Sequence, residues 1–223
     1  MSKILIIPAR AGSKRIKNKN IKRIGGIPII YHSIRTAIKS KIFDEIHVST
    51  ESKKIKEIVE KYPLKVKFLR EKKLSQDKTP LMEVFNFVFK RYKTMNITFD
   101  QIWFLTPCSP LIEKKDLILA DKKFKNKKIN AILAISEYSP PVQWAFKKVK
   151  NFIKPLHPKS LKIRSQDLKK SYYDTGTFGA FKKEAFLKKV KPVFYGFEIE
   201  RHKGIDIDTP SDWKLMEKLF KTK

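Results

Sequence analysis

The sequence predicts an α/β fold with a mostly parallel, doubly wound sheet and a small insertion, and three observations lead to this prediction. Lys3 to Ala9 is a near-continuous apolar run of strand length, which is typical of a strand buried on both faces of a parallel sheet. Extended and helical patterns then alternate along the chain as far as about Ser136. Between Glu137 and Leu168 prolines interrupt the pattern, so we expect an insertion there that projects from the sheet.

Each element follows from local spacing. Pro8 marks the end of the first strand, because proline cannot donate to a sheet ladder. Pro28 opens a helix with apolar residues at helical spacing. The next predicted elements, in order, are a strand at Asp44–Thr50, a helix at Ser52–Lys61, a strand at Lys65–Arg70, a helix at Leu81–Tyr92, a strand at Gln101–Thr106, a helix at Lys115–Phe124 and a strand at Ala131–Ser136. After the insertion we expect a strand at Thr175–Phe181, a short helix, two extended pieces and a helix from Pro210, all within a single domain of residues 1–223.

Composition points to a folded, cytoplasmic protein. A chain of 223 residues with 41% hydrophobic and 12% aromatic content can bury a substantial core. Cys108 is the only cysteine, which excludes an internal disulfide and a zinc site with two or more cysteine ligands. The apolar run at the N-terminus is too short for a secretory signal, and no run reaches the roughly 18 residues of a membrane span.

The charge balance is strongly basic. Lysine and arginine number 51 against 22 acidic residues, a net charge of +29 that suits a nucleic acid, an anionic membrane surface or a phosphorylated substrate. Only about eight of the cations are arginine, and the lysines are spread along the whole chain rather than clustered. A basic nucleic-acid-binding protein therefore stays as an alternative of a different class, although no module with base-stacking aromatic residues is apparent.

Cationic and small residues follow the first predicted strand in the stretch IPARAGSKRIKNKN. Ligands of open parallel sheets bind beyond the carboxyl ends of the strands, where Arg10, Ser13 and Lys14 are expected, together with Arg70 from another strand end. The small residues of this turn leave backbone N–H groups free to contact phosphate oxygens. The stretch matches neither the Walker pattern nor the dinucleotide-binding pattern, and a solvated basic turn is the alternative interpretation.

Two aspartates near the C-terminus form a second candidate site. Alternation along a strand at Ile205–Thr209 would place the Asp206 and Asp208 carboxylates on one face, and such a pair can share Mg²⁺ with water and substrate phosphates. Alternatively, Asp208 or Thr209 caps the helix that Pro210 begins, with Asp212 completing a capping box. Capping would account for one of the acids and leave Asp206 without a role.

A polar stretch after the prolines is the third candidate. It contains Arg164 to Leu168 and Tyr172 to Gly176, and its arginine could fork onto the carboxylate of an acidic sugar. A polar surface loop is the alternative. Cys108 and the four histidines form no evident nucleophile and base pair, so we expect them to be structural or on the surface.

Six segments of the chain form a recognisable set: IPARAGSKRIKNKNI, FDEIHVSTE, VKFLRE, LTPCSPLI, IRSQDL and GIDIDTPSDW. Through these segments the sequence resembles, nearly from end to end, the acylneuraminate cytidylyltransferase family, which activates nonulosonic acids with CTP. RSQDLKKSYYDTGTF is most similar to the pseudaminic acid enzymes of that family. The resemblance implies a nucleotide-diphospho-sugar transferase-like fold, Mg²⁺ as cofactor and a homodimer formed through the insertion.

The resemblance also implies roles for individual residues. Those implied to bind CTP are Arg10, Ser13, Lys14, Asn20 and Arg70, and those implied to face the sugar acid are Gln143, Arg164, Gln166 and Asp174. Asp206 and Asp208 would carry Mg²⁺. The family pattern is not matched everywhere: Pro80, Leu81, Thr106, Tyr173, Thr177 and Gly179 depart from it.

The implied reaction is attack of the sugar's anomeric hydroxyl on the α-phosphorus of CTP, with pyrophosphate leaving. Positioning and charge neutralisation dominate such a displacement, so Arg10, Lys14 and Asp208 are the expected catalytic residues. No general base is evident. Legionaminic, sialic and 3-deoxy-manno-octulosonic acids are the alternative sugar acids.

Overall fold

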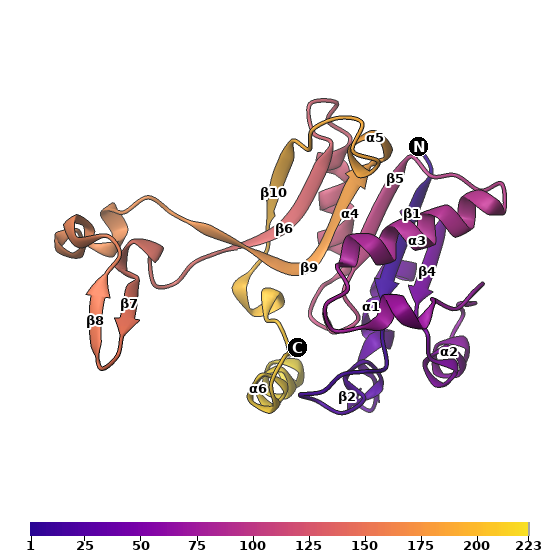
Figure 1. The fold of residues 1–223 in the computed structure, drawn as a ribbon, viewed down its shortest axis with the longest axis horizontal. Helices are drawn as coiled ribbons and strands as arrows, with labels where there is room; N and C mark the ends of the chain where they lie inside the picture. Colours follow the sequence, from indigo (N-terminus) through magenta and orange to yellow (C-terminus); the bar gives the residue numbers. More distant parts are fainter. Residues whose placement is uncertain (223) are drawn as a thin grey trace.

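The structure is a computed structural model that describes residues 1–222, and its centre is a six-stranded sheet with the strand order β10-β6-β9-β5-β1-β4 (Figure 1). Its strands are β1 (Lys3–Pro8), β4 (Glu45–Ser49), β5 (Gln101–Leu105), β6 (Ala131–Glu137), β9 (Tyr172–Lys182) and β10 (Phe194–Glu198). β1 pairs in parallel with β4 and β5, and β10 pairs in parallel with β6. β9 lies antiparallel between β5 and β6, which confirms a mostly parallel sheet.

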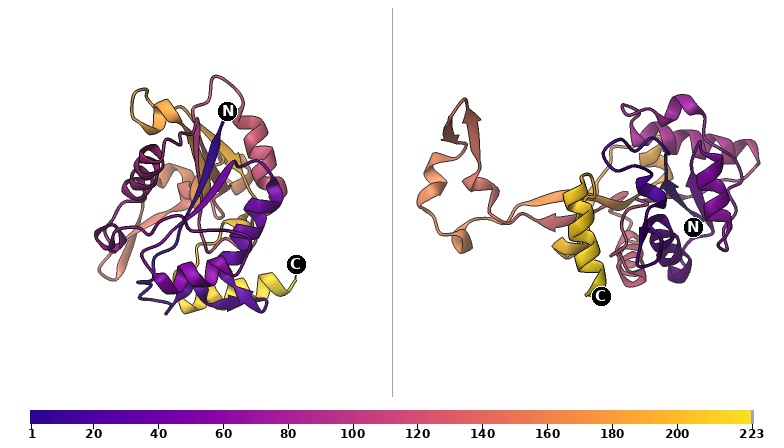
Figure 2. Two further views of the ribbon diagram at one scale, coloured as in Figure 1. Left: turned by 90° about the vertical axis from the view of Figure 1, so that its right-hand side faces the viewer. Right: turned by 90° about the horizontal axis from the view of Figure 1, so that it is seen from below.

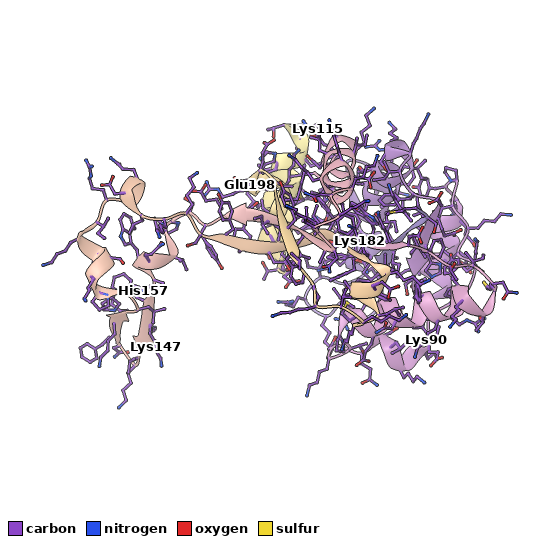
Figure 3. All side chains as sticks on the ribbon, turned by 90° about the horizontal axis from the view of Figure 1, so that it is seen from above. Lys90, Lys115, Lys147, His157, Lys182 and Glu198 are labelled. Carbon is purple, nitrogen blue, oxygen red and sulfur yellow. The ribbon has the colours of Figure 1, made fainter. Side chains whose placement is uncertain are left out.

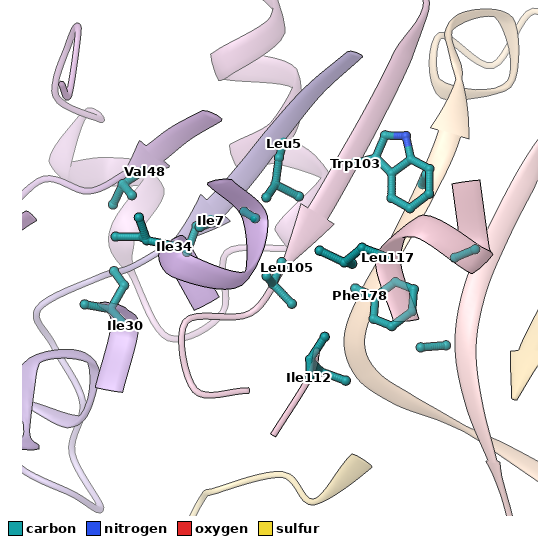
Figure 4. Close-up of a cluster of buried hydrophobic side chains, with 14 of the residues drawn as sticks. Leu5, Ile7, Ile30, Ile34, Val48, Trp103, Leu105, Ile112, Leu117 and Phe178 are labelled. Atoms are coloured by element: carbon teal, nitrogen blue, oxygen red, sulfur yellow. The ribbon is translucent and has the colours of Figure 1, made fainter. Parts of the chain in front are cut away.

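Helices cover both faces of the sheet, as a doubly wound fold requires. They are α1 (Ile29–Ser40), α2 (Lys53–Glu60), α3 (Leu81–Thr94), α4 (Lys114–Phe124), α5 (Lys183–Phe186) and α6 (Pro210–Lys221). Alternate side chains of β1 divide between the two faces: Leu5 and Ile7 pack with α1, α2 and α4, as Figure 4 shows for part of this core. Ile4 and Ile6 pack with α3 and α5 on the other face. The full burial of these four side chains explains the continuous apolar run in the sequence.

A smaller third core lies below the carboxyl ends of the strands. Ile16, from the turn after β1, packs there with Ile207 and Trp213, the last of these from α6. A short hairpin of β2 (Arg23–Ile24) and β3 (Ile27–Pro28) contributes Ile24. This core joins the segment after β1 to the segment before α6, although the two are almost the whole chain apart.

Two predicted strands are not strands in the structure. Lys65–Arg70 is irregular: the Val66 N–H donates to the Glu60 carboxylate, and only the Arg70 N–H reaches the extended chain after β4, at the Thr50 carbonyl. Ile205–Thr209 is extended but joins no sheet. The alternation was nevertheless useful in both segments, because Val66, Phe68 and Ile207 are buried as the pattern requires.

An arm extends from the far ends of β6 and β9, away from the body (Figures 1 and 2). It contains the hairpin of β7 (Phe146–Val149) and β8 (Phe152–Pro155), flanked by the short 3₁₀ helices η3 (Val142–Trp144), η4 (Pro158–Lys162) and η5 (Ser165–Asp167). This is the segment in which prolines interrupted the sequence pattern. Among residues 1–222, no helix has the length and apolarity needed to cross a membrane.

Candidate active site

The turn after β1 presents cations at the carboxyl end of the sheet. The Ala9 N–H donates to the Ser49 carbonyl, which holds the turn against the end of β4, and the Ser13 N–H closes a tight turn on the Ala11 carbonyl. Asn20, which is buried, donates from Nδ2 to the Arg10 carbonyl at 2.8 Å. A side-chain carbon placed at Gly12 would meet no atom within 4 Å, so this part of the turn faces open space that a ligand could fill.

A cavity of about 370 Å³ lies beside this turn, beyond the carboxyl ends of β1 and β5. Among its lining residues are Arg10, Ser13, Lys14 and Asn20 from the turn side. Asp206 and Asp208, which come almost two hundred residues later, line the same cavity. The structure therefore brings together the phosphate-turn candidates and the carboxylate pair.

The two aspartates differ in their surroundings. Asp208 accepts from Arg15 Nη2 at 2.6 Å and from Lys19 Nζ at 3.2 Å. Asp206 is in no hydrogen bond or ion pair among the described residues, and burial raises its pKa, with the charge of Asp208 adding to the effect. A carboxylate that lacks a cationic partner and faces a second carboxylate fits a divalent cation with oxygen ligands.

The capping alternative is also realised, one residue further on. The Thr209 hydroxyl accepts from the Asp212 N–H, and the Asp212 carboxylate accepts from the Thr209 N–H, which forms the capping box of α6. Hydrogen bonds from the Thr209 side chain, and then from the Thr209 and Asp208 N–H groups, lower the pKa of Asp212. Since Thr209 and Asp212 supply the cap, both Asp206 and Asp208 keep side chains directed to the cavity.

Arg70 is buried and does not line the cavity. Its Nη2 donates to Glu51 Oε2 at 3.1 Å, and its Nε donates to the Ser75 hydroxyl at 3.0 Å. The other Glu51 oxygen accepts from the Ala11 N–H at 2.8 Å. Glu51 thus ties Arg70 to the turn after β1, and we interpret Arg70 in this structure as a support of that turn.

Asp77, in the turn between η2 (Lys72–Ser75) and α3, bridges the two leading cations. Its Oδ1 accepts from Arg10 Nη1 and its Oδ2 from Lys14 Nζ, each at 2.5 Å. Hydrogen bonds from Lys14 and then Arg10 lower the pKa of Asp77, so it is an anion at neutral pH. No sequence pattern singled out this residue, which is one acid in a short polar loop.

Hydroxyl groups and one thiol line the cavity between the two charged sides. Thr106 Oγ1 and Ser109 Oγ are 2.5 Å apart, and Thr175 Oγ1 and Thr177 Oγ1 are 2.8 Å apart. Burial raises the pKa of Cys108 to about 12, so the thiol is neutral and unsuited to nucleophilic attack. This agrees with the expectation that Cys108 is structural.

The residues that the resemblance assigned to the sugar do not line the cavity. Gln143, Arg164 and Gln166 belong to the arm, which Figure 3 shows extending from the body, with Lys147 and His157 marking it. Arg164 Nε donates to Asp167 Oδ2 at 2.8 Å within the arm. Asp174 lies on β9, beside the cavity-lining residues Thr175 and Gly176, and its Oδ1 accepts from the Gly176 N–H at 2.9 Å.

Arg15 and Ser109, which follow strand ends, and Thr175 and Gly176, from the third candidate stretch, also line the cavity. Lys19 lines it too, although sequence reasoning gave this residue no role. Lys19 was visible within the basic stretch, but its spacing gave no indication that its Nζ would reach the Ile207 carbonyl at 2.6 Å.

The fold is that of a nucleotidyltransferase, and comparison with known proteins identifies the class. Residues 4–223 match the family described as cytidylyltransferase. The chain belongs to that family and is a CTP-dependent nucleotidyltransferase. The likeness to a solved structure, a CMP:2-keto-3-deoxy-manno-octonic acid synthetase complexed with CTP, supports the fold: the TM-score is 0.72 over 100% of this chain and 99% of that chain, at 14% identity.

Individual relatives carry a more specific likeness. The chain is 36% identical to a pseudaminic acid cytidylyltransferase of Campylobacter jejuni, over 99% of this chain and 97% of that protein. It is 31% identical to a CMP-N,N'-diacetyllegionaminic acid synthase of Legionella pneumophila, over 97% of this chain and 95% of that protein. An N-acylneuraminate cytidylyltransferase of Streptococcus agalactiae is 28% identical over 96% of this chain and 52% of its own length.

Proposed function

We propose that this enzyme transfers CMP from CTP to pseudaminic acid and releases pyrophosphate. The observation that carries the proposal is the single cavity in which the cationic turn of Arg10 and Lys14 lies with Asp206 and Asp208. The choice of sugar is supported by the 36% identity to a pseudaminic acid cytidylyltransferase over nearly the full chain. We place the reaction in the cytoplasm, where CTP is available.

Arg10, Ser13 and Lys14 would hold the triphosphate. Guanidinium and ammonium groups neutralise charge that builds up on the leaving pyrophosphate, and they act most strongly where the surrounding turn is already in place. Glu51 and Asn20 keep this turn fixed through the Ala11 N–H and the Arg10 carbonyl. The catalytic contribution of Arg10 and Lys14 is therefore electrostatic, without a covalent step.

Asp206 and Asp208 would hold Mg²⁺, because both carboxylates line the cavity and Asp206 makes no ion pair with a cation among the described residues. When bound, the ion supplies charge neutralisation and polarisation at the α-phosphoryl group. Arg15 and Lys19 hold Asp208 in position in its absence. Asp206→Asn should therefore raise the Mg²⁺ concentration needed for half-maximal turnover by at least tenfold while leaving the fold intact.

A homodimer formed through the arm is part of the proposal. The arm exposes large apolar side chains, among them Phe152, which is 75% exposed, and Ile153, which is 62% exposed. Exposed apolar side chains that cluster in this way are typical of a protein–protein interface. Gln143, Arg164 and Gln166 lie on this arm rather than at the cavity of their own chain. A second copy of the chain would bring such residues to a sugar acid bound in the cavity.

The test supplies the purified enzyme with CTP, Mg²⁺ and one sugar acid at a time from a panel of pseudaminic, legionaminic, sialic and 3-deoxy-manno-octulosonic acids. We expect pyrophosphate release and a CMP-linked product with the highest kcat/KM for pseudaminic acid. A higher kcat/KM for legionaminic acid would correct the substrate and keep the reaction. Lys14→Ala should abolish turnover with every acid, whereas Lys17→Ala, an exposed lysine of the same stretch that does not line the cavity, should not.

A nucleic-acid-binding function is the alternative from another class, and the net charge of +29 is its only support. It predicts steeply salt-dependent binding to arbitrary DNA or RNA, without turnover of CTP. Salt-dependent binding with no pyrophosphate release would favour it.

A further inference from the structure

The Asp77 carboxylate lies between Arg10 and Lys14 and pairs with both cations. Its two carboxylate oxygens are divided between the two cations, one on Arg10 Nη1 and the other on Lys14 Nζ. A phosphate group bridging the same pair would use two of its oxygens in the same way. Among residues 1–222, Asp77 is the one acidic residue that pairs with either cation.

These ion pairs are exposed and therefore exchangeable. The side chains of Lys14 and Asp77 are 80% and 42% exposed, and Arg10 is 35% exposed. Solvated pairs of this kind contribute little, because water competes for both partners and salt screens them. A polyphosphate with several negative charges can displace a single carboxylate from such a site.

The loop that carries Asp77 is anchored at both ends. On one side the Ser75 hydroxyl donates to Glu51 Oε2 at 2.9 Å and accepts from Arg70 Nε. On the other side α3 begins at Leu81, which lines the cavity. A displaced Asp77 carboxylate therefore stays close to the two cations, and it is available again as soon as the polyphosphate leaves.

We propose that Asp77 is an exchangeable internal anion that occupies Arg10 and Lys14 between turnovers and weakens the retention of the pyrophosphate product. The proposal rests on the phosphate role assigned to Arg10 and Lys14 above. In each cycle the triphosphate of CTP displaces the carboxylate, and the carboxylate then competes with pyrophosphate for the same two cations. Asp77 thus sets the balance between substrate capture and product release, acting through Arg10 and Lys14.

The test measures binding of inorganic tripolyphosphate and pyrophosphate to the full-length protein by calorimetry at low ionic strength. Asp77→Asn removes the carboxylate charge at nearly constant size and should lower both dissociation constants by about three- to tenfold, the range of two lost surface ion pairs. The inhibition constant of pyrophosphate during turnover should fall by a similar factor. The difference in polyphosphate affinity between Asp77→Asn and the unaltered protein should shrink at about 0.5 M salt, because salt screens exposed ion pairs.

Two further variants separate this role from a general charge effect. Glu71→Gln removes the same charge close to the same loop, where Glu71 pairs with Lys73 at 2.8 Å, and it should leave polyphosphate binding within about twofold of the unaltered protein. Asp77→Glu keeps the carboxylate charge, so this variant should bind polyphosphate about as weakly as the unaltered protein does. Unchanged or weaker polyphosphate binding by Asp77→Asn would overturn the proposal, because Asp77 would then organise the cations rather than compete for them.

Lys14→Ala separates the proposed role of Asp77 from the proposed binding of phosphate by Arg10 and Lys14, on which it rests. Loss of tripolyphosphate binding in Lys14→Ala, together with tighter binding in Asp77→Asn, supports both. Loss in Lys14→Ala without tighter binding in Asp77→Asn overturns the role of Asp77 alone. Unaltered binding by Lys14→Ala overturns the phosphate assignment and the role of Asp77 with it.

Discussion

At the scale of single residues, Glu51 connects the turn after β1 to the rest of the molecule. It accepts from the Ala11 N–H and from Arg70 and Ser75. Although burial alone would raise the pKa of Glu51, the hydrogen bond from Ala11 and those from its own N–H, Ser75 and Arg70 lower it overall. Because folding lowers this pKa, the ionised Glu51 carboxylate stabilises the fold fully at pH values above its ordinary pKa. That contribution is lost as the pH falls through the lowered pKa of the folded protein.

We expect Glu51→Gln to lower the free energy of unfolding by about 1–3 kcal/mol, because the amide leaves the buried Arg70 without its anion. The KM for CTP should rise as the Ala11 turn loosens. Denaturant melts and steady-state kinetics measure the two effects. Glu57→Gln, on the exposed side of α2, is the control. If Glu51→Gln and Glu57→Gln had the same stability and the same KM for CTP, Glu51 would not support the turn.

The sequence indicated only part of this residue-scale picture. Arg10, Ser13 and Lys14 could be predicted to lie at the ligand-binding edge of the sheet because they directly follow a strongly apolar strand. Parallel sheets bind ligands at that edge. Glu51 and Asp77 could not, because a carboxylate is chosen as a partner by tertiary geometry and no spacing in the sequence encodes it. Arg70 was expected at the nucleotide, but its side chain reaches Glu51 and Ser75 instead.

At the scale of elements, Lys203 joins η6 (Arg201–Gly204) to the start of α4. Its buried Nζ donates to Glu113 Oε2 at 2.9 Å and to both oxygens of Asp116 at 3.0 and 3.1 Å. Asp116 also completes the capping box of α4 with Glu113. This contact fixes the chain immediately before the Asp206 segment.

Lys203→Met should destabilise the protein by about 3 kcal/mol at neutral pH, since it leaves the buried Asp116 carboxylate without a cation beside Glu113, which keeps only Lys115. Hydrogen bonds from Lys203 and then Lys115 lower the pKa of Glu113 from 4.5 to about 2. The contribution of Glu113 is therefore complete above pH 4.5 and is lost as the pH falls toward about 2. The stability difference between the two proteins, measured by denaturant melts at several pH values, should shrink over that interval.

Lys214→Met, on the exposed side of α6, is the matched control for Lys203→Met and should leave stability within about 0.5 kcal/mol. A stability difference that stays constant down to pH 2 would contradict the assigned role of the Lys203 contacts.

Strands were predicted correctly where buried side chains belong to a backbone that pairs with a neighbouring strand, and incorrectly where the side chains are buried but the backbone has no partner strand. The apolar runs of β1 and β5 lie in the centre of the sheet, so pattern and ladder agree. Lys65–Arg70 and Ile205–Thr209 also alternate between buried and exposed residues, but neither forms a ladder, because alternation reports which side chains are buried and not whether the backbone has a partner strand. The antiparallel insertion of β9 between β5 and β6 had no signal in local spacing.

At the scale of the whole molecule, the proposed dimer makes a prediction about shared sites. Lys14→Ala removes a cavity residue and keeps an intact arm, whereas Arg164→Ala alters the arm and keeps an intact cavity. If the arm of one copy completes the cavity of the other, coexpressing the two inactive variants should restore about a quarter of full activity, because mixed dimers contain one intact site.

Activity of the mixture no greater than the sum of the two variants would contradict the shared site. Sedimentation of Phe152→Lys provides the control for assembly. This change places a charge on the most exposed aromatic residue of the arm and should weaken the dimer without altering the cavity.

The most direct measurement is a crystal structure with CTP and Mn²⁺ in place of Mg²⁺, using the anomalous signal of manganese to locate the ion. We expect the triphosphate on Arg10 and Lys14, with the Asp77 carboxylate displaced and the anomalous peak beside Asp206 and Asp208. A triphosphate bound away from the Ala11 turn, or an ion with neither aspartate among its ligands, would contradict it.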